Sequence, residues 1–240
     1  MSFFKTIKHW FTEAPHFEGT ITASERIGAR IQKVTISLPA PVAVPFPVGC
    51  FVQAMTWGVI PRAYSVATAT TTSFTLLVSF SGMGAGSRFF ASAPLGTKVT
   101  CYGPFDDFPY HAGTGRTKIF FATSTGVAPF RRMVEIPLKE GFETALFLGT
   151  PKESDIAFKK EFEDLERTSP LFHFIPVLSA GDETWKGARG YVTDQFKGRG
   201  DLLRESDIYI CGVPMMTAGV LAMLKKEGVP ESQIFVQKFG

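Results

Sequence analysis

The stretch KIFFATSTGVAPF, residues 118–130, has the pattern of a β-strand that turns directly into an α-helix. Its apolar run ends in the polar turn 123–126, and Pro129 suits the first turn of a helix that begins near Ala128. Free N–H groups at a helix N-terminus attract phosphate, and Gly126 lets a ligand approach the backbone closely. The alternative is a simple tight turn, since neither G-x-G-x-x-G nor a Walker lysine is present.

The alternation of strand and helix continues from this stretch to the C-terminus. Strands are expected at 144–150, 172–178, 208–212 and 234–239, helices at 154–167 and 214–228, and GYVTDQFK (190–197) completes the run. Ser154 or Asp155 is expected to cap the helix that follows it. Apolar strands that alternate with amphipathic helices predict a parallel, Rossmann-like sheet covered on both faces.

The chain before residue 104 has a different pattern. Six short β-rich runs are separated by turns rich in proline and glycine, and a helix at 87–93 interrupts them. These runs predict a small antiparallel barrel of the Greek-key type or, alternatively, a sandwich. With a linker at 111–117, the expected domains are residues 1–113, which include an N-terminal segment rich in Phe and Trp, and 114–240. That segment is expected to form a short helix on the body; a membrane or partner contact is the alternative.

The composition is that of an ordinary globular protein of 240 residues, 45% of them hydrophobic and 20% charged. Cys50, Cys101 and Cys211 form no C-x-x-C pair, which favours a reducing cytoplasm, and the four histidines show no zinc-ligand spacing, so no metal site is expected. Residues 34–61 carry no charge, but the prolines at 39, 41, 45 and 47 argue against a transmembrane helix.

Charge is divided unevenly between the two halves. Residues 1–105 hold eight basic and three acidic residues, a net charge of +5, whereas residues 106–240 carry a net charge of −2. No acid lies between Glu25 and Asp106. The first half therefore favours anions, either a phosphate-bearing cofactor or an acidic protein partner. Nucleic acid is not expected, because the basic residues do not form a stripe.

The stretch RAYS (62–65) combines a cation, an aromatic ring and a hydroxyl on one expected strand. Arg62 and Tyr64 would point to one face and Ser65 to the other. The ring can stack on a flat heterocycle while the arginine pairs with its phosphate tail, although a cation–π pair on the barrel wall is the structural alternative.

Two further stretches are candidates for binding anions or ligands. Gly84 and Gly86 precede a helix expected near Ser87 and can form an anion cradle or a flexible loop. Cys211, with the glycine that follows it, falls at the carboxyl edge of the predicted sheet, where α/β folds bind ligands, and Pro214 opens the next helix. A buried strand cysteine is otherwise a small apolar filler.

Taken in order, these stretches resemble the ferredoxin–NAD(P)+ reductase superfamily over about residues 18–240. The similar pieces are a Gly-x-aromatic-Val strand, an Arg-x-Tyr-Ser flavin signature, a Gly-x-x-Ser phosphate segment, the element that closes the barrel, and a loop like Gly-Thr-Gly-Ile-Ala-Pro-Phe. In this chain they read GCFV (49–52), RAYS (62–65), GAGS (84–87), GPF (103–105) and STGVAPF (124–130), and WKGARGYV (185–192) and CGVPMM (211–216) follow at the expected places.

The resemblance implies a role for each of these residues. Arg62 would face the flavin pyrophosphate, Tyr64 would stack on the isoalloxazine, and Ser65 would bond near its N5. Cys211 would line the nicotinamide near the hydride path, so Ser65 and Cys211 are the expected catalytic residues. The remaining cofactor-binding residues expected from the matching motifs are Ala63, Gly84, Gly86, Ser87, Thr125, Gly126, Gly212, Pro214, Met215 and, over the flavin's other face, Phe239.

Three departures from the family pattern affect the cofactor and the chemistry. Asp106 stands where a second glycine is common, and features shared with the FMN-binding branch leave FMN as the alternative to FAD. Gln237 replaces a frequent glutamate, which argues against a proton relay there. The residues after the strand at 172–178 are Ser-Ala followed by two acids at 182–183, which favours NADH over NADPH unless Lys152, Lys186 or Arg189 compensates.

The resemblance therefore implies a flavin-dependent NAD(P)H oxidoreductase that exchanges single electrons with a small acidic carrier such as a ferredoxin or flavodoxin. A reductase of free flavin or another small acceptor is the first alternative. A reductase subunit of an oxygenase or other electron-transfer complex is the second, and a plain nucleotide-binding regulator the third.

Overall fold

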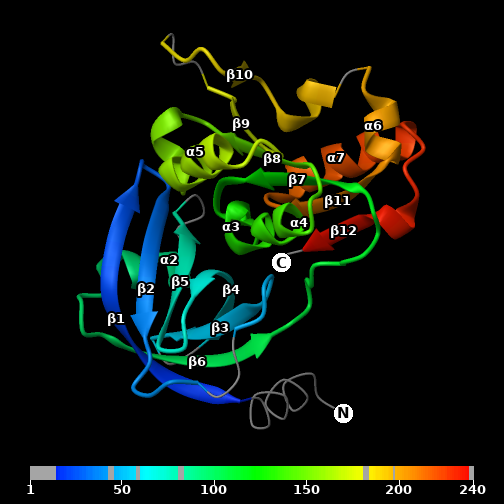
Figure 1. Ribbon diagram of the computed structural model, residues 1–240. Coiled ribbons are helices and arrows are strands. Elements are labelled where there is room, and N and C mark those ends of the chain that lie inside the picture. Colours follow the sequence, from blue (N-terminus) through cyan, green and yellow to red (C-terminus); the bar gives the residue numbers. More distant parts are fainter. Residues whose placement is uncertain are drawn as a thin grey trace, which may run out of the picture.

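The computed structural model describes residues 15–42, 46–57, 60–80, 84–180, 184–196 and 198–237. Two bodies stand one above the other in Figure 1, an antiparallel barrel below and a parallel sheet with helices above. The predicted N-terminal helix and Phe239 lie outside the described residues.

The barrel is closed and antiparallel, with strand order β1-β2-β5-β4-β3-β6. Its strands are β1 (His16–Ile27), β2 (Ile31–Ser37), β3 (Phe51–Thr56), β4 (Ile60–Ala69), β5 (Ser73–Ser79) and β6 (Lys98–Phe105). Alternate residues point inward, as Val52 and Ala54 do on β3, because successive side chains of a strand face opposite sides. The helix α2 (Ala85–Ser92) adds Phe89 and Phe90 to this core. The predicted barrel is confirmed.

The second body is a six-stranded parallel sheet in the order β10-β9-β8-β7-β11-β12. Its strands are β7 (Thr117–Thr123), β8 (Thr144–Thr150), β9 (Phe172–Leu178), β10 (Ala188–Arg189), β11 (Ser206–Cys211) and β12 (Ile234–Gln237). The strand order reverses between β7 and β11, which makes their carboxyl ends the switch point where such folds bind ligands.

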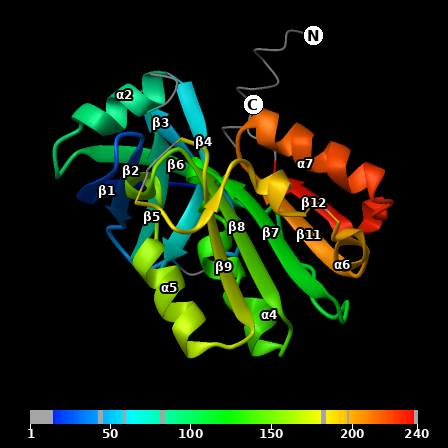
Figure 2. The same ribbon diagram turned by 90° about the horizontal axis from the view of Figure 1, so that it is seen from above.

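Helices lie on both faces of this sheet, as Figure 2 shows for α5 and α7. One face packs on α3 (Phe130–Met133), α4 (Glu135–Lys139) and α5 (Lys159–Thr168), and the other packs on α6 (Gly200–Arg204) and α7 (Pro214–Lys226). Between β9 and β11 the described residues, 179–180, 184–196 and 198–205, form only short elements: β10, the 3-10 turn η3 (Val192–Phe196) and α6. The second face is therefore covered less completely than the sequence pattern predicts.

The expected cap of the helix at 154–167 is wrong. Glu153–Asp155 form a 3-10 turn, Phe158 takes a left-handed conformation (φ 58°), and α5 begins only at Lys159. Asp155 is buried, and its carboxylate accepts a hydrogen bond from the backbone N–H of Ala29, 3.0 Å away on the β1–β2 turn. A tertiary contact between the two bodies therefore takes the acid that the local pattern assigned to the helix.

The predicted helix near Ala128 differs at its start. The chain enters a 3-10 turn, η1 (Ser124–Val127), immediately after β7, and α3 follows at Phe130. Further contacts tie the two bodies together, including a hydrogen bond from the Arg132 guanidinium to the Phe46 carbonyl at 3.0 Å. We propose that the domain boundary lies between residues 113 and 114, in the connection from β6 to β7.

Candidate functional site: a cofactor cleft between barrel and sheet

The two loops at the switch point pack directly on each other. The Thr123 hydroxyl accepts a hydrogen bond from the backbone N–H of Val213 at 3.0 Å, which ties the end of β7 to the start of α7. A Cβ on Gly126 would lie 2.2 Å from the Cys211 carbonyl oxygen, and one on Gly212 would meet Thr123 equally closely. These two glycines are therefore required by the approach of the two loops, whatever the cleft holds.

A cleft of about 310 Å3 opens between these loops and the barrel wall. Of the residues predicted from the sequence, it brings together Ala63, Tyr64, Ser65, Ser87, Thr125, Gly126, Gly212 and Pro214. Thr123 and Ser124, from the predicted phosphate-binding turn 123–126, also line it. The remaining wall comes from residues that the sequence did not single out for binding: Leu77, Val78 and Ser79 of β5, with Ala128 and Val213. Local motifs do not reveal β5, because it reaches the cleft only through its pairing with β4.

Tyr64 is partly buried on the barrel side of the cleft. Its ring meets Phe90 edge-on, with centroids 5.3 Å apart and an interplanar angle of 87°. A Cβ on Gly86 would lie 2.2 Å from the Tyr64 hydroxyl, so a larger residue there would require the Tyr64 ring to move. Burial raises the pKa of this hydroxyl to about 12, against the smaller opposing effect of the Arg62 guanidinium. The phenol is therefore neutral at physiological pH.

Arg62 is exposed and, within the described part of the chain, has no carboxylate partner. It lies two residues before Tyr64, and its Cγ is 3.4 Å from the Cβ position of Gly86 on α2. A cation held beside the cleft without an anion fits the phosphate tail of a nucleotide.

Ser65 connects the two bodies at the floor of the cleft. Its hydroxyl donates a 2.9 Å hydrogen bond to Oε1 of Gln237, the last residue of β12. The Cys211 thiol lies 3.6 Å from the same oxygen and donates to it. Burial raises the pKa of this thiol well above its usual value, and the negative charge of Asp107 adds to the rise. Cys211 is therefore a neutral thiol and not a nucleophile.

Some of the expected binding residues take positions that the motifs alone did not indicate. The Ser87 hydroxyl donates to the Ser79 carbonyl oxygen at 2.6 Å. Gly84 is exposed and has open space around it. Cys211 lies beneath the cleft surface, and Met215, 81% exposed, stands on the first turn of α7.

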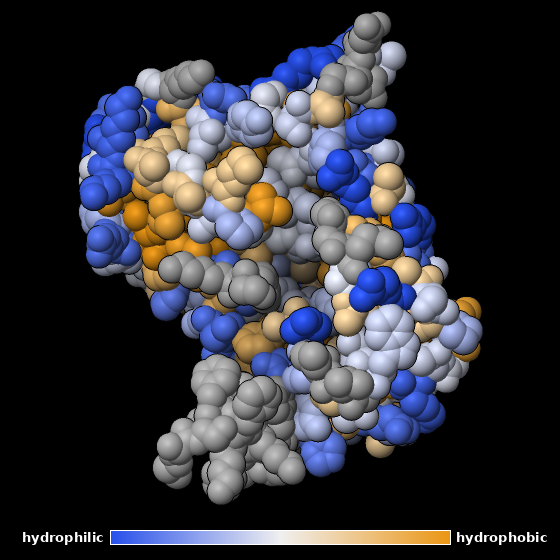
Figure 3. All heavy atoms as spheres, turned by 180° about the vertical axis from the view of Figure 1, so that it is seen from behind, coloured by the Kyte–Doolittle hydropathy of each residue, from blue (hydrophilic) through white to orange (hydrophobic). Residues whose placement is uncertain are grey.

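Figure 3 shows apolar side chains gathered on the upper half of the molecule, which holds the sheet.

The barrel wall beside the cleft contains one polar atom that needs a partner. Oε1 of Gln53 is buried and accepts no hydrogen bond in the described structure. Gln53 lies directly opposite Ala63 in the β3–β4 register, so the two side chains share one face of the wall. By the same register Arg62 and Tyr64 lie opposite Ala54 and Val52, on the other face of the strand pair, so Gln53 would accept from a donor on the side of Ala63.

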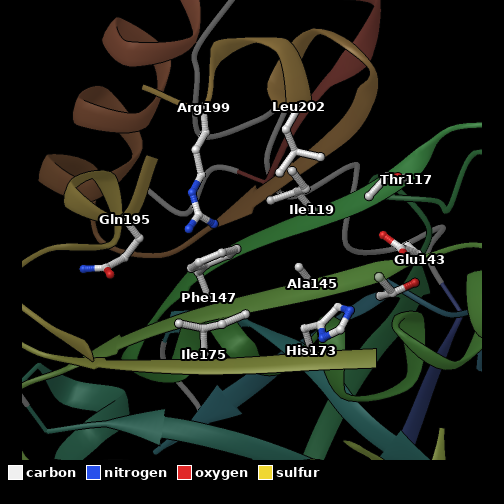
Figure 4. Close-up of a pocket in the computed structure, with 11 residues that line it drawn as sticks. Thr117, Ile119, Glu143, Ala145, Phe147, His173, Ile175, Gln195, Arg199 and Leu202 are labelled. Carbon is white, nitrogen blue, oxygen red and sulfur yellow. The ribbon is translucent and has the colours of Figure 1, made fainter. Parts of the chain in front are cut away.

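A larger pocket of about 390 Å3 lies elsewhere, over the amino-terminal part of the sheet. In Figure 4, Ile119, Phe147 and Ile175 form an apolar floor, while Arg199 extends over it from above. None of the predicted site residues lines this pocket. Its size reflects the thin cover between β9 and β11, and we do not assign the chemistry to it.

Comparison with known proteins adds independent evidence. Residues 120–221 match the family model of the oxidoreductase NAD-binding domain. Over 244 aligned residues the chain is 29% identical to ferredoxin–NADP reductase B of Sorangium cellulosum, covering 95% of this chain and 99% of that protein. This nearly full-length similarity supports the ferredoxin–NAD(P)+ reductase superfamily that the motifs indicate. The predicted two-domain fold, a closed antiparallel barrel and a parallel sheet with helices, is confirmed.

Two further similar proteins, one curated relative and one solved structure, match this chain to different extents. One subunit of the Na(+)-translocating NADH-quinone reductase of Klebsiella pneumoniae is 30% identical over 166 residues, which are 65% of this chain and 40% of that polypeptide. The structure of a ferredoxin NADP+ reductase from Neisseria gonorrhoeae with bound FAD and NADP has a TM-score of 0.76 at 22% identity, covering 94% of this chain and 99% of that one.

Two features are absent from the residues that the structure describes. They contain no helix that is both long and apolar enough to span a bilayer. They also contain no cluster of His, Cys, Asp and Glu suited to hold a metal ion.

Proposed function

We propose that this protein is a reductase that binds FAD in the cleft, accepts hydride from NADH, and passes single electrons to a small acidic carrier such as a ferredoxin or flavodoxin. One observation carries the proposal. A single cleft collects the RAYS strand of the barrel and both glycine loops of the switch point. FAD, when bound, supplies the exchange between two-electron and one-electron steps, while the protein orients the reactants and excludes water.

Each part of the cleft has a proposed task. Arg62 neutralises the pyrophosphate, and Gly84, Gly86 and Ser87 at the start of α2 offer backbone N–H groups to it. The Ser87 hydroxyl would also donate to the phosphate on leaving the Ser79 carbonyl oxygen. Tyr64 lies against the isoalloxazine. Ala63 and Ser65, from the same barrel strand, are proposed to border the reactive edge of the isoalloxazine.

The nicotinamide nucleotide is proposed to enter from the sheet side. Thr125 and Gly126 would bind its phosphates, and Gly212, Pro214 and Met215 would hold the nicotinamide above Cys211. Phe239 is proposed to cover the opposite face of the flavin. The preference for NADH rests on the sequence Ser179–Ala180 after β9 and the acids at 182–183. Arg189, which lies opposite Leu178 in the β10–β9 pairing, is the guanidinium that would favour a 2′-phosphate instead.

Anaerobic mixing of the purified protein with NADH and NADPH, separately, tests flavin, hydride transfer and nucleotide choice together. We expect a visible flavin spectrum that NADH bleaches faster than NADPH. A colourless protein that binds neither FAD nor FMN would overturn the proposal. Faster bleaching by NADPH would overturn only the nucleotide preference.

The acidic carrier is proposed because no acid occurs between Glu25 and Asp106. Added salt should slow turnover with a ferredoxin much more than turnover with a neutral dye, because salt screens attraction between charged surfaces. Equal salt responses would remove this part of the proposal.

Two alternatives remain open to test. Loss of yellow colour on gel filtration would indicate that flavin is a dissociable substrate, as in a free-flavin reductase. Copurification with an oxygenase component or another redox protein would indicate a subunit of a larger complex. A cytoplasmic location is part of the proposal, supported by three free, buried cysteines.

A further inference from the structure

We propose that Asp107 and Gln237 are positioning residues that fix the hydrogen-bond direction at the cleft floor, so that Ser65 meets the flavin as an acceptor. This inference rests on the proposed function for its meaning. The bonds that carry it are present in the protein itself and can be tested without flavin.

The orientation of the Gln237 amide is set by Asp107. The amide nitrogen of Gln237 lies 3.4 Å from Oδ1 of Asp107, a long but permitted hydrogen bond. A carboxylate only accepts, so the NH₂ group of the amide must face Asp107. The carbonyl end, Oε1, must then face the opposite way, toward Ser65 and Cys211.

With Oε1 in this position, both protons at the cleft floor are engaged. The Ser65 hydroxyl and the Cys211 thiol each donate to the same oxygen, at 2.9 and 3.6 Å, and an amide oxygen has two lone pairs to receive them. Ser65 lines the cleft, so its own lone pairs remain available to a ligand. It can accept a hydrogen bond from an N–H group in the cleft, but it has no proton left to donate.

Burial makes this direction persistent. Ser65 is 6% exposed, Gln237 4% and Cys211 0%, so water competes little for these donors and acceptors. Asp107 is exposed and keeps its carboxylate at the edge of the site. An amide carries no titrating proton, so Gln237 orients its neighbours and does not relay protons.

The consequence concerns the oxidation state that the site favours. Reduced flavin carries a proton on N5 and can donate there, whereas oxidised flavin can only accept at N5. A Ser65 that accepts therefore stabilises the reduced form relative to the oxidised form. Without Asp107 the amide can turn over, its NH₂ group can donate to Ser65, and the serine proton becomes free to enter the cleft.

The first test uses the flavin-free protein and the infrared S–H stretching band of Cys211, assigned by its loss in Cys211→Ala. We expect Asp107→Ala to shift this band toward the position of a free thiol, because no acceptor then holds the Gln237 amide nitrogen. The matched control is Asp106→Ala, the neighbouring exposed acid, which should leave the band in place. An unchanged band in Asp107→Ala would overturn the proposal.

The double variant Asp107→Asn with Gln237→Glu exchanges the carboxylate and the amide. The amide now at position 107 can donate to the carboxylate now at position 237, which accepts from both Ser65 and Cys211, so the S–H band should return to its hydrogen-bonded position. Failure of this exchange to restore the band would mean that Asp107 acts in another way, and would also overturn the proposal.

The second test measures the ratio of reduced to oxidised flavin at a fixed redox poise. Asp107→Ala should lower this ratio about fivefold, the size expected for one hydrogen bond, and Asp106→Ala should change it less. A protein that shows the band shift but binds no flavin would contradict the proposed function and leave the positioning roles standing. A protein that binds flavin but shows neither the band shift nor the change in the flavin ratio would contradict the positioning roles and leave the proposed function standing.

Discussion

The parallel sheet borders two hollows of similar volume, the cofactor cleft and a groove near its amino-terminal part. The cofactor cleft stands at the carboxyl ends of β7 and β11, with walls from both domains and close-packed glycine loops, and Arg62 lies next to its wall residue Ala63. The groove of Figure 4 lies at the amino-terminal part of the same sheet and has walls from the second domain alone. The groove is the larger of the two, but none of the residues predicted to bind a cofactor lines it.

The difference arises from how parallel sheets are built. At the switch point the connections leave β7 and β11 in opposite directions, so a crevice opens wherever strand order reverses. The groove exists because the chain between β9 and β11 supplies short elements where a longer helix would cover the sheet. One hollow follows from topology, and the other follows from incomplete cover.

The largest expected effect comes from closing the cleft at its base. Gly126→Ala places a methyl group 2.2 Å from the Cys211 carbonyl oxygen and should destabilise the protein by about 3 kcal/mol, measured by urea unfolding. Reduction by NADH should also be lost. Gly219→Ala on α7, whose nearest contact is 3.9 Å, is the control and should be neutral or slightly stabilising.

The next effect separates the two arginines that border the two hollows. Arg62→Ala should weaken FAD binding about 10- to 100-fold, because a charge-assisted hydrogen bond to phosphate is lost. Arg199→Ala, in the groove, should leave FAD affinity unchanged. Titration of the apoprotein with FAD, followed by flavin fluorescence, measures both. Equal losses in the two variants would break the distinction between cleft and groove.

A smaller effect concerns pH and Tyr64. The unfolded phenol ionises near pH 10, and the folded one only at about 12, so the unfolded state loses its proton first as pH rises. This contribution to stability is full below pH 10 and declines between pH 10 and 12. Between pH 9 and 11 the unfolding free energy of the wild type should therefore fall more than that of Tyr64→Phe, by on the order of 1 kcal/mol.

Denaturant unfolding of the flavin-free protein at the two pH values measures this difference. The same change at the exposed Tyr191 serves as the control for removal of a phenol hydroxyl. Identical pH profiles for wild type and Tyr64→Phe would show that the ring is not buried as described.

The smallest effect is expected in the groove floor. Ile175→Thr exchanges a half-buried apolar side chain for a smaller polar one, at a cost below about 1.5 kcal/mol of stability. Turnover with NADH should stay within twofold of wild type in a steady-state assay. A large loss of turnover at normal stability would show that the groove takes part in the reaction.

Much of the fold could be predicted because its signals are local. The period of the apolar residues separated barrel from sheet, and the turn after Phe121 marked the switch-point strand. The wrong prediction at Ser154 and Asp155 shows the limit of such signals. An N-cap pattern is satisfied within a few residues, but the carboxylate found a partner 126 residues away.

The sequence by itself determined the two patterns, the order of the motifs and the residue types that a nucleotide needs. Only the tertiary structure decided that Ser65 donates to Gln237, 172 residues away, and that Asp107 faces the same amide across 130 residues. The physical reason is that periodicity and turn chemistry act over a few residues, whereas the direction of a buried hydrogen bond depends on every donor and acceptor that the fold brings within about 3.5 Å.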